Sequence, residues 1–536
     1  MESFDRNSLL KKLDAKIIWD LVIIGGGATG LGIAVDAATR GYKTLLVEQS
    51  DFAKGTSSRS TKLVHGGVRY LAQGDIGLVR EALKERGRLL QNAPHLTKNE
   101  SIIIPCYSYL SAAKYVAGLK LYDWLSAGLS FGASRLIKKN TLKTKLPTIA
   151  KKGLKCGVLY HDGTFDDARL ALNLAQTAVE HGAVCLNYVK ATALHKNSDG
   201  RINGVDILDK LSNVAYQISA SSVVNATGVF ADEILHMDNQ LAKSTIRPSQ
   251  GIHLVLDRKF LNSPDGIMIP KTDDGRVLFV LPWYDKVLMG TTDTPLDKHD
   301  LEPRALETEI QFVLKTAGKY LDQVPARKDV LSVYAGLRPL AATGDKNDKT
   351  KEISRSHKVL VTKSGLVSVI GGKWTTYRKM AEDTLDKMIQ QGLLIKATCK
   401  TVNLSIHGGA QFRKPEAGFE LKSAVFADPL AIYGSDKHLM EALMQSNLEL
   451  ARPVGGYKRL LAIQVVWAVR FEMAQTVEDV LARRIRILFT DAKKAIELAL
   501  PVAAIMAAEL GLDAQWQQRQ VEDFTRLAEG YLITGF

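Results

Sequence analysis

The first clear pattern along the chain is a short apolar run, Ile17–Ile24, that ends in glycines. A run of this length next to glycine is typical of a strand buried in a parallel sheet. Residues 31–40 follow with alanines and apolar side chains suited to a helix packed on that strand, and Gly41 ends the helix. Lys43–Val47 predicts the next strand, so the N-terminal region is expected to fold as strand, turn, helix and strand.

The turn of this unit carries a glycine fingerprint, with Gly25, Gly27 and Gly30 in the sequence GGGATG. Gly25 permits a tight turn, Gly27 lets the main chain approach a pyrophosphate, and Gly30 brings helix and strand close together. Glu48 ends the second strand and suits an acid that binds a ribose hydroxyl pair. Because Glu48 would repel a 2′-phosphate, the site favours FAD or NAD over NADP. Glycines also serve ordinary turns, so the prediction rests on the complete series of elements.

The middle of the chain continues the α/β pattern and then changes period. A helix is expected over 168–181, and Val223-Val224 lead to a strand that ends in the small-residue turn Asn225–Gly228. From residue 251 to 294 apolar and polar residues tend to alternate, which predicts an antiparallel sheet with one solvated face. A buried strand at 366–370 is followed by Gly371-Gly372, which open a second helix.

Helical spacing dominates after Ser435, where residues 477, 480, 481, 485 and 488 fall on one apolar face. The last part of the chain is therefore predicted to be a helical domain. Its arginines Arg483, Arg484 and Arg486 are expected to form a solvated face of that domain.

Composition excludes several classes of protein. The 536 residues include only four cysteines, which are far apart and contain no C-x-x-C pair, so neither a disulfide framework nor a cysteine zinc site is indicated. None of the 11 histidines forms an H-E-x-x-H motif, and metal catalysis has no support. The net charge of +14 favours anionic partners. No helix-turn-helix, finger or RNA-binding motif accompanies that charge, so no nucleic-acid partner is predicted.

The charge raises the question of a membrane surface. No apolar run approaches the length of a membrane-spanning helix, and no signal peptide is recognised at the N-terminus. Residues 102–139 mix aromatic and aliphatic side chains with Lys114, Lys120, Lys138 and Lys139. This segment is predicted either to lie in the interface of an anionic membrane or to be buried against the dinucleotide-binding domain.

One block of sequence is far more specific than these patterns. Residues 55–71 read GTSSRSTKLVHGGVRYL, and DDARL, NATG, GTTDT, AGLRPL and GGKWTTYRK follow at 166–170, 225–228, 290–294, 335–340 and 371–379. The chain thereby resembles the FAD-dependent glycerol-3-phosphate dehydrogenases. The resemblance implies FAD as cofactor and oxidation of sn-glycerol 3-phosphate to dihydroxyacetone phosphate. Electrons pass to membrane quinone in dehydrogenase members and to oxygen in oxidase relatives, so both acceptors stay open.

The expected fold is α/β, with a doubly wound (Rossmann-like) FAD-binding domain, an inserted antiparallel-sheet substrate domain and a helical C-terminal domain. The FAD-binding domain is assigned to residues 18–100, 160–250 and 351–392. Residues 101–159 are assigned to a cap or membrane-surface segment, 251–350 to the substrate domain and 393–536 to the helical domain. The enzyme is expected to be cytoplasmic and peripheral on the inner face of the cytoplasmic membrane. Quaternary state is left open, with a homodimer among the alternatives.

The resemblance also implies roles for single residues at the substrate. Arg338 and Lys373 are expected to hold the substrate phosphate, since a guanidinium binds phosphate oxygens in a fork, and Arg69 and Tyr70 would complete the pocket. His253 is placed near the substrate hydroxyl, where a neutral imidazole suits a general base, although a histidine in a strand can equally be a packing residue. Arg338 and Lys373 argue against the alternative of an amino-acid or hydroxyacid oxidase.

Other residues of the same blocks are assigned to the cofactor. Hydroxyl and ammonium donors for the pyrophosphate and the flavin edge are expected from Ser57, Ser58, Thr61 and Lys62, with a helix N-cap as the alternative for either serine. His65 with Gly66 and Gly67 is expected at the flavin ring. Gly228 belongs to the same set, and Gly371, Gly372 and Thr376 begin a helix whose positive end would face the reduced flavin.

Overall fold

A largely parallel sheet organises the first half of the fold. The computed structural model describes residues 4–13, 16–71, 74–126, 131–273, 275–342, 357–410 and 428–533. The sheet has the order β19-β20-β12-β2-β3-β8, and only the edge strand β19 is antiparallel to its neighbour. Its strands are β2 (Leu21–Ile24), β3 (Thr44–Val47), β8 (Val184–Leu186), β12 (Val223–Asn225), β19 (Lys358–Val361) and β20 (Val367–Ile370). The five parallel strands are buried throughout, as expected for strands covered on both faces.

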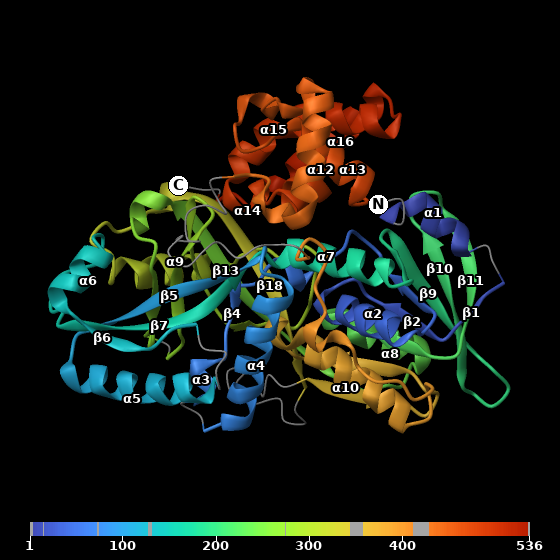
Figure 1. Ribbon diagram of the computed structural model, residues 1–536, viewed down its shortest axis with the longest axis horizontal. Helices are drawn as coiled ribbons and strands as arrows, with labels where there is room; N and C mark the ends of the chain where they lie inside the picture. Colours follow the sequence, from blue (N-terminus) through green and yellow to red (C-terminus); the bar gives the residue numbers. More distant parts are fainter. Residues whose placement is uncertain are drawn as a thin grey trace.

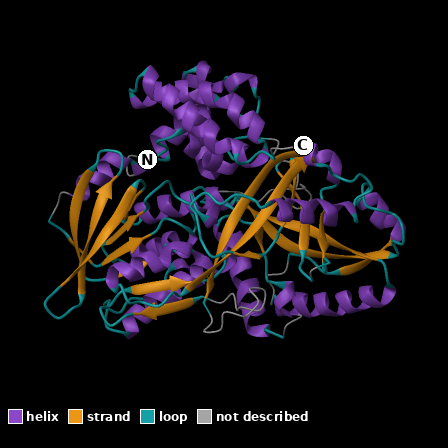
Figure 2. Ribbon diagram, turned by 180° about the vertical axis from the view of Figure 1, so that it is seen from behind, coloured by secondary structure: helices purple, strands orange, loops and turns teal. Residues whose placement is uncertain are grey.

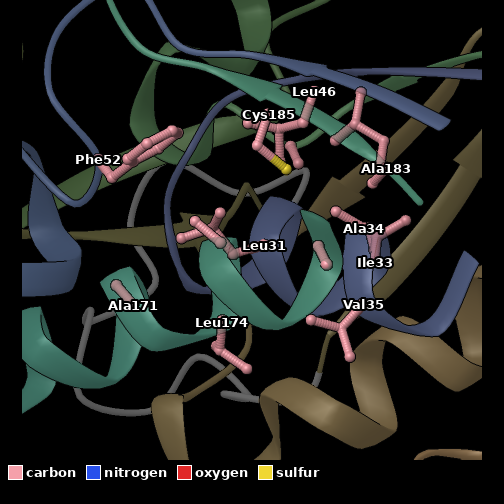
Figure 3. Close-up of a cluster of buried hydrophobic side chains, with 14 of the residues drawn as sticks. Leu31, Ile33, Ala34, Val35, Leu46, Phe52, Ala171, Leu174, Ala183 and Cys185 are labelled. Atoms are coloured by element: carbon pink, nitrogen blue, oxygen red, sulfur yellow. The ribbon is translucent and has the colours of Figure 1, made fainter. Parts of the chain in front are cut away.

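Beside this sheet, helix α2 (Ala28–Arg40) packs against both α7 (Asp167–Glu180) and α10 (Tyr377–Gln390). Leu31 and Ile33 of α2, Leu174 of α7 and Cys185 of β8 belong to the same buried cluster, which Figure 3 shows from within. Gly41 ends α2 with φ +95°, a conformation that glycine adopts without strain. The predicted doubly wound α/β domain is confirmed.

The apolar run Ile17–Ile24 differs from the prediction, because it forms two short strands in two sheets. β1 (Ile18–Trp19) pairs with β11, whereas β2 pairs with β3 and β12. The two strands are separated by Asp20, whose carboxylate accepts a hydrogen bond from the Lys43 N–H at 2.8 Å. β1 belongs to a smaller sheet with β9 (Val189–Lys196), β10 (Ile202–Asp209) and β11 (Val214–Ala220).

The second half of the fold is a large mixed sheet in the order β17-β13-β16-β15-β14-β5-β7-β4, with β18 paired to β13 and β6 to β7. Its strands are β4 (Leu63–Val64), β5 (Thr97–Cys106), β6 (Arg135–Lys138), β7 (Cys156–Phe165), β13 (Ile246–Asp257), β14 (Gly266–Ile269), β15 (Leu278–Trp283), β16 (Lys286–Gly290), β17 (Thr294–Pro295) and β18 (Val330–Ala341). The sequence assigned residues 101–159 and 251–350 to separate units. The parallel pairing of β5 with β14 instead joins both segments in one sheet.

Further helices surround the three sheets. They are α1 (Arg6–Leu10), α3 (Val68–Leu71), α4 (Ile76–Asn92), α5 (Tyr109–Leu125), α6 (Lys139–Lys145), α8 (Ala231–Asp238) and α9 (Glu307–Gly318). Figure 1 shows α5 along the outer side of the large sheet, at the far end from the smaller sheet. Among the described residues, no helix is long and apolar enough to cross a membrane.

The helical C-terminal domain comprises α12 (Lys437–Ser446), α13 (Ala462–Phe471), α14 (Ile487–Thr490), α15 (Ala492–Leu510) and α16 (Ala514–Glu529). In both overall views it sits above the junction of the two halves (Figures 1 and 2). Val255, Trp283 and Tyr334 of the large sheet share a buried cluster with Leu481 and Phe489 of this domain. The face of the large sheet that was predicted to be solvated is therefore covered by helices.

The predicted solvated arginines of this domain are instead buried. A single turn of π-helix (Asp479–Arg484) and a left-handed Arg486 (φ +69°) break the expected regular helix. Arg483 and Arg484 each bind the carboxylate of Asp51 at 2.5 Å. Burial would raise the pKa of Asp51, but the two guanidiniums outweigh it and hold that pKa at about 2. Arg486 binds Asp167 at 3.1 Å. Asp51 and Asp167 lie far from these arginines in the sequence, so a local sequence pattern does not reveal the pairing.

Candidate active site

A cavity lies between the parallel sheet and the large sheet. Gly25, Gly27 and Glu48 line it on the side of the parallel sheet, and His253 and Arg338 of the large sheet also belong to its wall. Other lining residues come from the loops after β3, β12 and β20, at the carboxyl ends of parallel strands. Ligands of open α/β sheets bind at this edge. The cavity thus connects the glycine fingerprint with the residues predicted to bind substrate.

The glycine turn is shaped to receive a phosphate. Gly25 has φ +113°, and a Cβ at Gly30 would lie 1.9 Å from the carbonyl oxygen of Gly25. A Cβ at Gly27 would stand 3.0 Å from the Ser57 hydroxyl, which accepts the Ala28 N–H at 2.9 Å. Gly30 does not line the cavity and acts through helix packing. The absence of side chains at these positions leaves the N-terminus of α2 open to an anion, so the turn fits a pyrophosphate.

Glu48 lines the cavity beside this turn. Its carboxylate accepts the N–H groups of Gly26 at 2.7 Å and Ser50 at 2.9 Å. Burial raises its pKa, although these two hydrogen bonds oppose the rise. Glu48 therefore fixes the glycine turn and is still available to a ribose from the cavity side.

Glycines also open the cavity from the opposite loops. Gly228, Gly371 and Gly372 line it with φ of +62°, +77° and +96°. The second helix begins one turn later than predicted, because a 3-10 turn (Trp374–Thr376) precedes α10. Thr376 is buried and does not line the cavity, whereas its neighbour Thr375 does and accepts the His65 N–H at 3.2 Å. The sequence prediction missed Thr375 by one position.

Arg338, on β18, is held by oxygen atoms of neighbouring segments. Its Nη1 donates to the carbonyl of Gln250 at 3.2 Å, and its Nη2 donates to the carbonyl of Thr292 at 2.9 Å and to the Thr291 hydroxyl at 3.1 Å. Asp293 lies 3.5 Å away, and the side chain keeps 20% of its surface exposed. Lys373 lies in the same cavity wall. The guanidinium is thus fixed in direction at the cavity wall.

His253, on β13, is almost fully buried at 3% exposure. Its Nε2 lies 2.9 Å from the hydroxyl of Thr61, and its ring stacks on Tyr334 with centroids 4.9 Å apart. Burial lowers the pKa of His253 well below its usual value, and the positive charges of Lys62 and Arg338 lower it further. The imidazole is therefore neutral at physiological pH, the state that a general base requires.

Lys62 differs most from its prediction as a donor to the cofactor. Its ammonium is buried outside the cavity wall and donates to the carbonyl of Ser58 at 2.7 Å and to Asp167 at 2.6 Å. Burial and the nearby Arg486 lower the pKa of Lys62 to about 7, against the attraction of Asp167. Lys62 therefore acts behind the loop rather than on the cofactor.

Three other predicted cofactor residues also lie outside the cavity wall: Ser58, Gly66 and Gly67. Gly66 is required by packing, since a Cβ there would lie 2.4 Å from Leu83. Ser57, Thr61 and His65 do line the cavity. The side chains of Arg69 and Tyr70 lie outside the described residues. Within the described ranges no cluster of three or more metal-ligating side chains occurs.

Two protein-family models match the chain. Residues 20–378 match the model described as FAD dependent oxidoreductase. Residues 399–517 match the C-terminal domain of alpha-glycerophosphate oxidase. The two matched ranges correspond to the body that contains the three sheets and to most of the helical domain.

Curated relatives match over nearly the whole chain. The mitochondrial glycerol-3-phosphate dehydrogenase of Schizosaccharomyces pombe is 35% identical over 98% of this chain and 89% of that protein. The human mitochondrial glycerol-3-phosphate dehydrogenase is 37% identical over 96% of this chain and 74% of that protein.

The fold is also similar to those of solved structures. The glycerol-3-phosphate dehydrogenase of Bacillus halodurans, complexed with FAD, is 30% identical, with a TM-score of 0.79 over 100% of this chain and 99% of that chain. The L-alpha-glycerophosphate oxidase of Mycoplasma pneumoniae, with FAD bound, is 17% identical with a TM-score of 0.53 over 72% of this chain and 97% of that chain. At that identity the second likeness concerns the fold alone.

Proposed function

Because the chain belongs to the family of FAD-dependent glycerol-3-phosphate dehydrogenases, we propose that it oxidises sn-glycerol 3-phosphate to dihydroxyacetone phosphate and passes the electrons to a membrane quinone. One observation carries the proposal: a single cavity joins a glycine turn that fits a pyrophosphate to His253 and Arg338. The cofactor end and the substrate end are therefore parts of one site.

FAD would be held by the residues that line the cavity around the two glycine turns. They are Gly25, Gly27, Glu48, Ser57, His65, Gly228, Gly371 and Gly372. FAD, when bound, supplies the acceptor for a hydride from the substrate carbon. Gly371 and Gly372 precede the N-terminal end of α10, whose partial positive charge would favour a reduced, anionic ring.

The substrate phosphate would bind Arg338 and Lys373 at the other end, with Arg69 and Tyr70 as further proposed contacts. A guanidinium already fixed by three oxygen partners loses little side-chain entropy when it binds an anion. With the phosphate anchored there, the C2 hydroxyl would lie toward His253, whose neutral imidazole would take the hydroxyl proton.

The proposed quinone acceptor is supported by the surface of α5 rather than by the cavity. Leu110, Trp124 and Tyr109 are 83%, 76% and 67% exposed on this helix. Lys114 and Lys120 are exposed on the same helix, and Lys138 and Lys139 follow nearby. Exposed apolar side chains among lysines suit the interface of an anionic membrane. We therefore propose a peripheral enzyme on the inner face of the cytoplasmic membrane.

The substrate assignment is tested by mixing the oxidised holoenzyme with sn-glycerol 3-phosphate under anaerobic conditions. The proposal predicts that the flavin absorbance bleaches and that dihydroxyacetone phosphate appears in equal amount. An unchanged flavin spectrum would refute the substrate. Quinone or oxygen added to the bleached enzyme then decides the acceptor, because an oxidase would reoxidise in oxygen alone and release hydrogen peroxide.

The membrane assignment is tested with vesicles of anionic lipid. Trp124→Ser should weaken vesicle binding about tenfold, since burial of one large apolar side chain contributes roughly 1.5–3 kcal/mol. Leu241→Ser is the matched control, because Leu241 is 90% exposed near the end of α8. An equal loss of vesicle binding in both variants would contradict a membrane role for α5.

The oligomeric state is a separate question. Light scattering of the same proteins without vesicles decides whether a homodimer forms.

A further inference from the structure

The surroundings of His253 place the Thr61 hydroxyl beside its Nε2. The ring is stacked on Tyr334 on one face, and a Cβ at Gly290 would come within 2.3 Å of its Cδ2. Nδ1 is buried and makes no hydrogen bond within the described part of the chain. Nε2 faces the Thr61 hydroxyl at 2.9 Å. Thr61 and His253 both line the cavity, so an alcohol bonded to the Thr61 hydroxyl is connected to Nε2 through it.

Thr61 lies on the cavity wall and is partly exposed, in contrast to the buried ring behind it. A threonine hydroxyl can accept one hydrogen bond and donate another at the same time. The Thr61 oxygen can therefore accept from a substrate hydroxyl while its own proton points to Nε2. This is the arrangement that a proton relay needs.

The loop that carries Thr61 is fixed on both sides. The Tyr334 hydroxyl donates to the Ser60 carbonyl at 3.0 Å, so the ring that stacks on His253 is tied to the residue before Thr61. Behind the loop, the N–H and hydroxyl of Ser60 donate to Asp167 at 3.1 and 2.7 Å. The register between Thr61 and His253 is thus held by partners on both sides of the loop.

The C-terminal domain completes this support. Arg486 donates to Asp167 at 3.1 Å and to the Ser58 carbonyl at 2.7 Å. Lys62 donates to the same two groups from within the loop. Two buried cations from distant parts of the sequence therefore hold one carboxylate and one carbonyl, and through them the loop that presents Thr61.

We propose that Thr61 is a catalytic residue that relays the substrate proton to His253. This rests on the proposed function. As the C2 hydride leaves for the flavin and the C2–O bond becomes a carbonyl, the hydroxyl proton passes to the Thr61 oxygen. The Thr61 proton passes at the same time to Nε2, which becomes the site of the net proton. Thr61 ends the step unchanged, and His253 is left as an imidazolium.

The test compares Thr61→Val with Thr61→Ser in the holoenzyme. Valine keeps the shape of threonine without its hydroxyl, and serine keeps the hydroxyl. Thr61→Val should slow anaerobic flavin reduction by glycerol 3-phosphate about 100-fold, the lower part of the range for acid–base catalysis, with little change in substrate affinity. Thr61→Ser should recover most of that rate. The control Thr384→Val removes a buried hydroxyl that donates to the Met380 carbonyl in α10, and should reduce its flavin at the wild-type rate.

A second readout does not depend on turnover. In protein labelled with ¹⁵N-histidine, the Nε2 resonance of His253 should shift in Thr61→Val and stay in place in Thr384→Val. Wild-type reduction rates in Thr61→Val, or an unmoved His253 resonance, would overturn the relay. A wild-type enzyme that fails to bleach with glycerol 3-phosphate would refute the proposed function instead, and the resonance would still decide whether Thr61 and His253 are bonded.

Discussion

At the scale of single residues, the site depends on which charged side chains line the cavity. Arg338 and Lys62 both come from specific sequence blocks, and both were predicted to bind a ligand. Arg338 lines the cavity, whereas Lys62 lies outside the cavity wall and donates hydrogen bonds to Asp167 and to the Ser58 carbonyl. The sequence block identifies the region but not the direction of each side chain, because Asp167 lies 105 residues away from Lys62.

Arg338 gives the first prediction. Arg338→Met should raise the KM for glycerol 3-phosphate about 10- to 100-fold, because a hydrogen bond to a charged group contributes roughly 1.5–3 kcal/mol. Arg338→Lys should recover only part of this, since an ammonium lacks the planar fork. Steady-state kinetics with glycerol 3-phosphate and with glycerol provide the measurement. An equal rise in the KM for glycerol, which has no phosphate, would contradict phosphate binding by Arg338.

At the scale of elements, the strand, glycine turn and helix at the N-terminus were predictable because their signals are local. Gly41 ends α2, and Gly25 takes the positive φ that the turn requires. The run Ile17–Ile24 was not predictable in the same way. Its division between two sheets depends on β11, which lies about 200 residues further along the chain.

The packing of Gly30 against the glycine turn can be tested by substitution. Gly30→Ala should weaken FAD binding roughly tenfold or more, because the added Cβ would sit 1.9 Å from the Gly25 carbonyl oxygen and overpacking costs about 1–3 kcal/mol. The fraction of protein that retains flavin after dialysis measures the effect, with circular dichroism to monitor folding. Gly118→Ala in α5 is the control, since a Cβ there meets nothing within 4 Å. Full flavin retention by Gly30→Ala would contradict the packing argument.

At the scale of the whole molecule, buried ion pairs join the C-terminal domain to the body that contains the three sheets. Arg483 and Arg484 reach Asp51, and Arg486 reaches Asp167. The sequence predicted a separate helical domain correctly but placed these arginines in solvent. Their burial follows from partners more than 300 residues away in the sequence. The helical periodicity of the C-terminal segment carries no information about such distant partners.

His407 joins the same two parts through Glu180 at 2.5 Å and Asp436 at 2.8 Å. Burial would lower its pKa, but the hydrogen bonds to Asp436 and Glu180 outweigh burial and raise the pKa to about 9. A folded-state pKa above the unfolded value stabilises the fold fully below about pH 6.5, and this contribution is lost as the pH rises through about 9.

His407→Gln should therefore lower the free energy of unfolding by roughly 2 kcal/mol at pH 6, a value reduced from the full shift because Glu180 is partly solvated, and by much less at pH 10. Urea unfolding at the two pH values measures the difference. His438→Gln, at an exposed position on α12, serves as the control. If His407→Gln lowered the free energy of unfolding equally at both pH values, the protonated His407 would not stabilise the fold through its ion pairs.

In the proposed reaction an anchored phosphate places the C2 carbon of the substrate against the flavin. The most direct measurement is the rate of anaerobic flavin bleaching by glycerol 3-phosphate deuterated at C2, compared with substrate deuterated at C1. We expect slower bleaching for C2 deuterium and an unchanged rate for C1 deuterium. Slower bleaching for C1 deuterium, or no bleaching with either substrate, would contradict the proposed reaction.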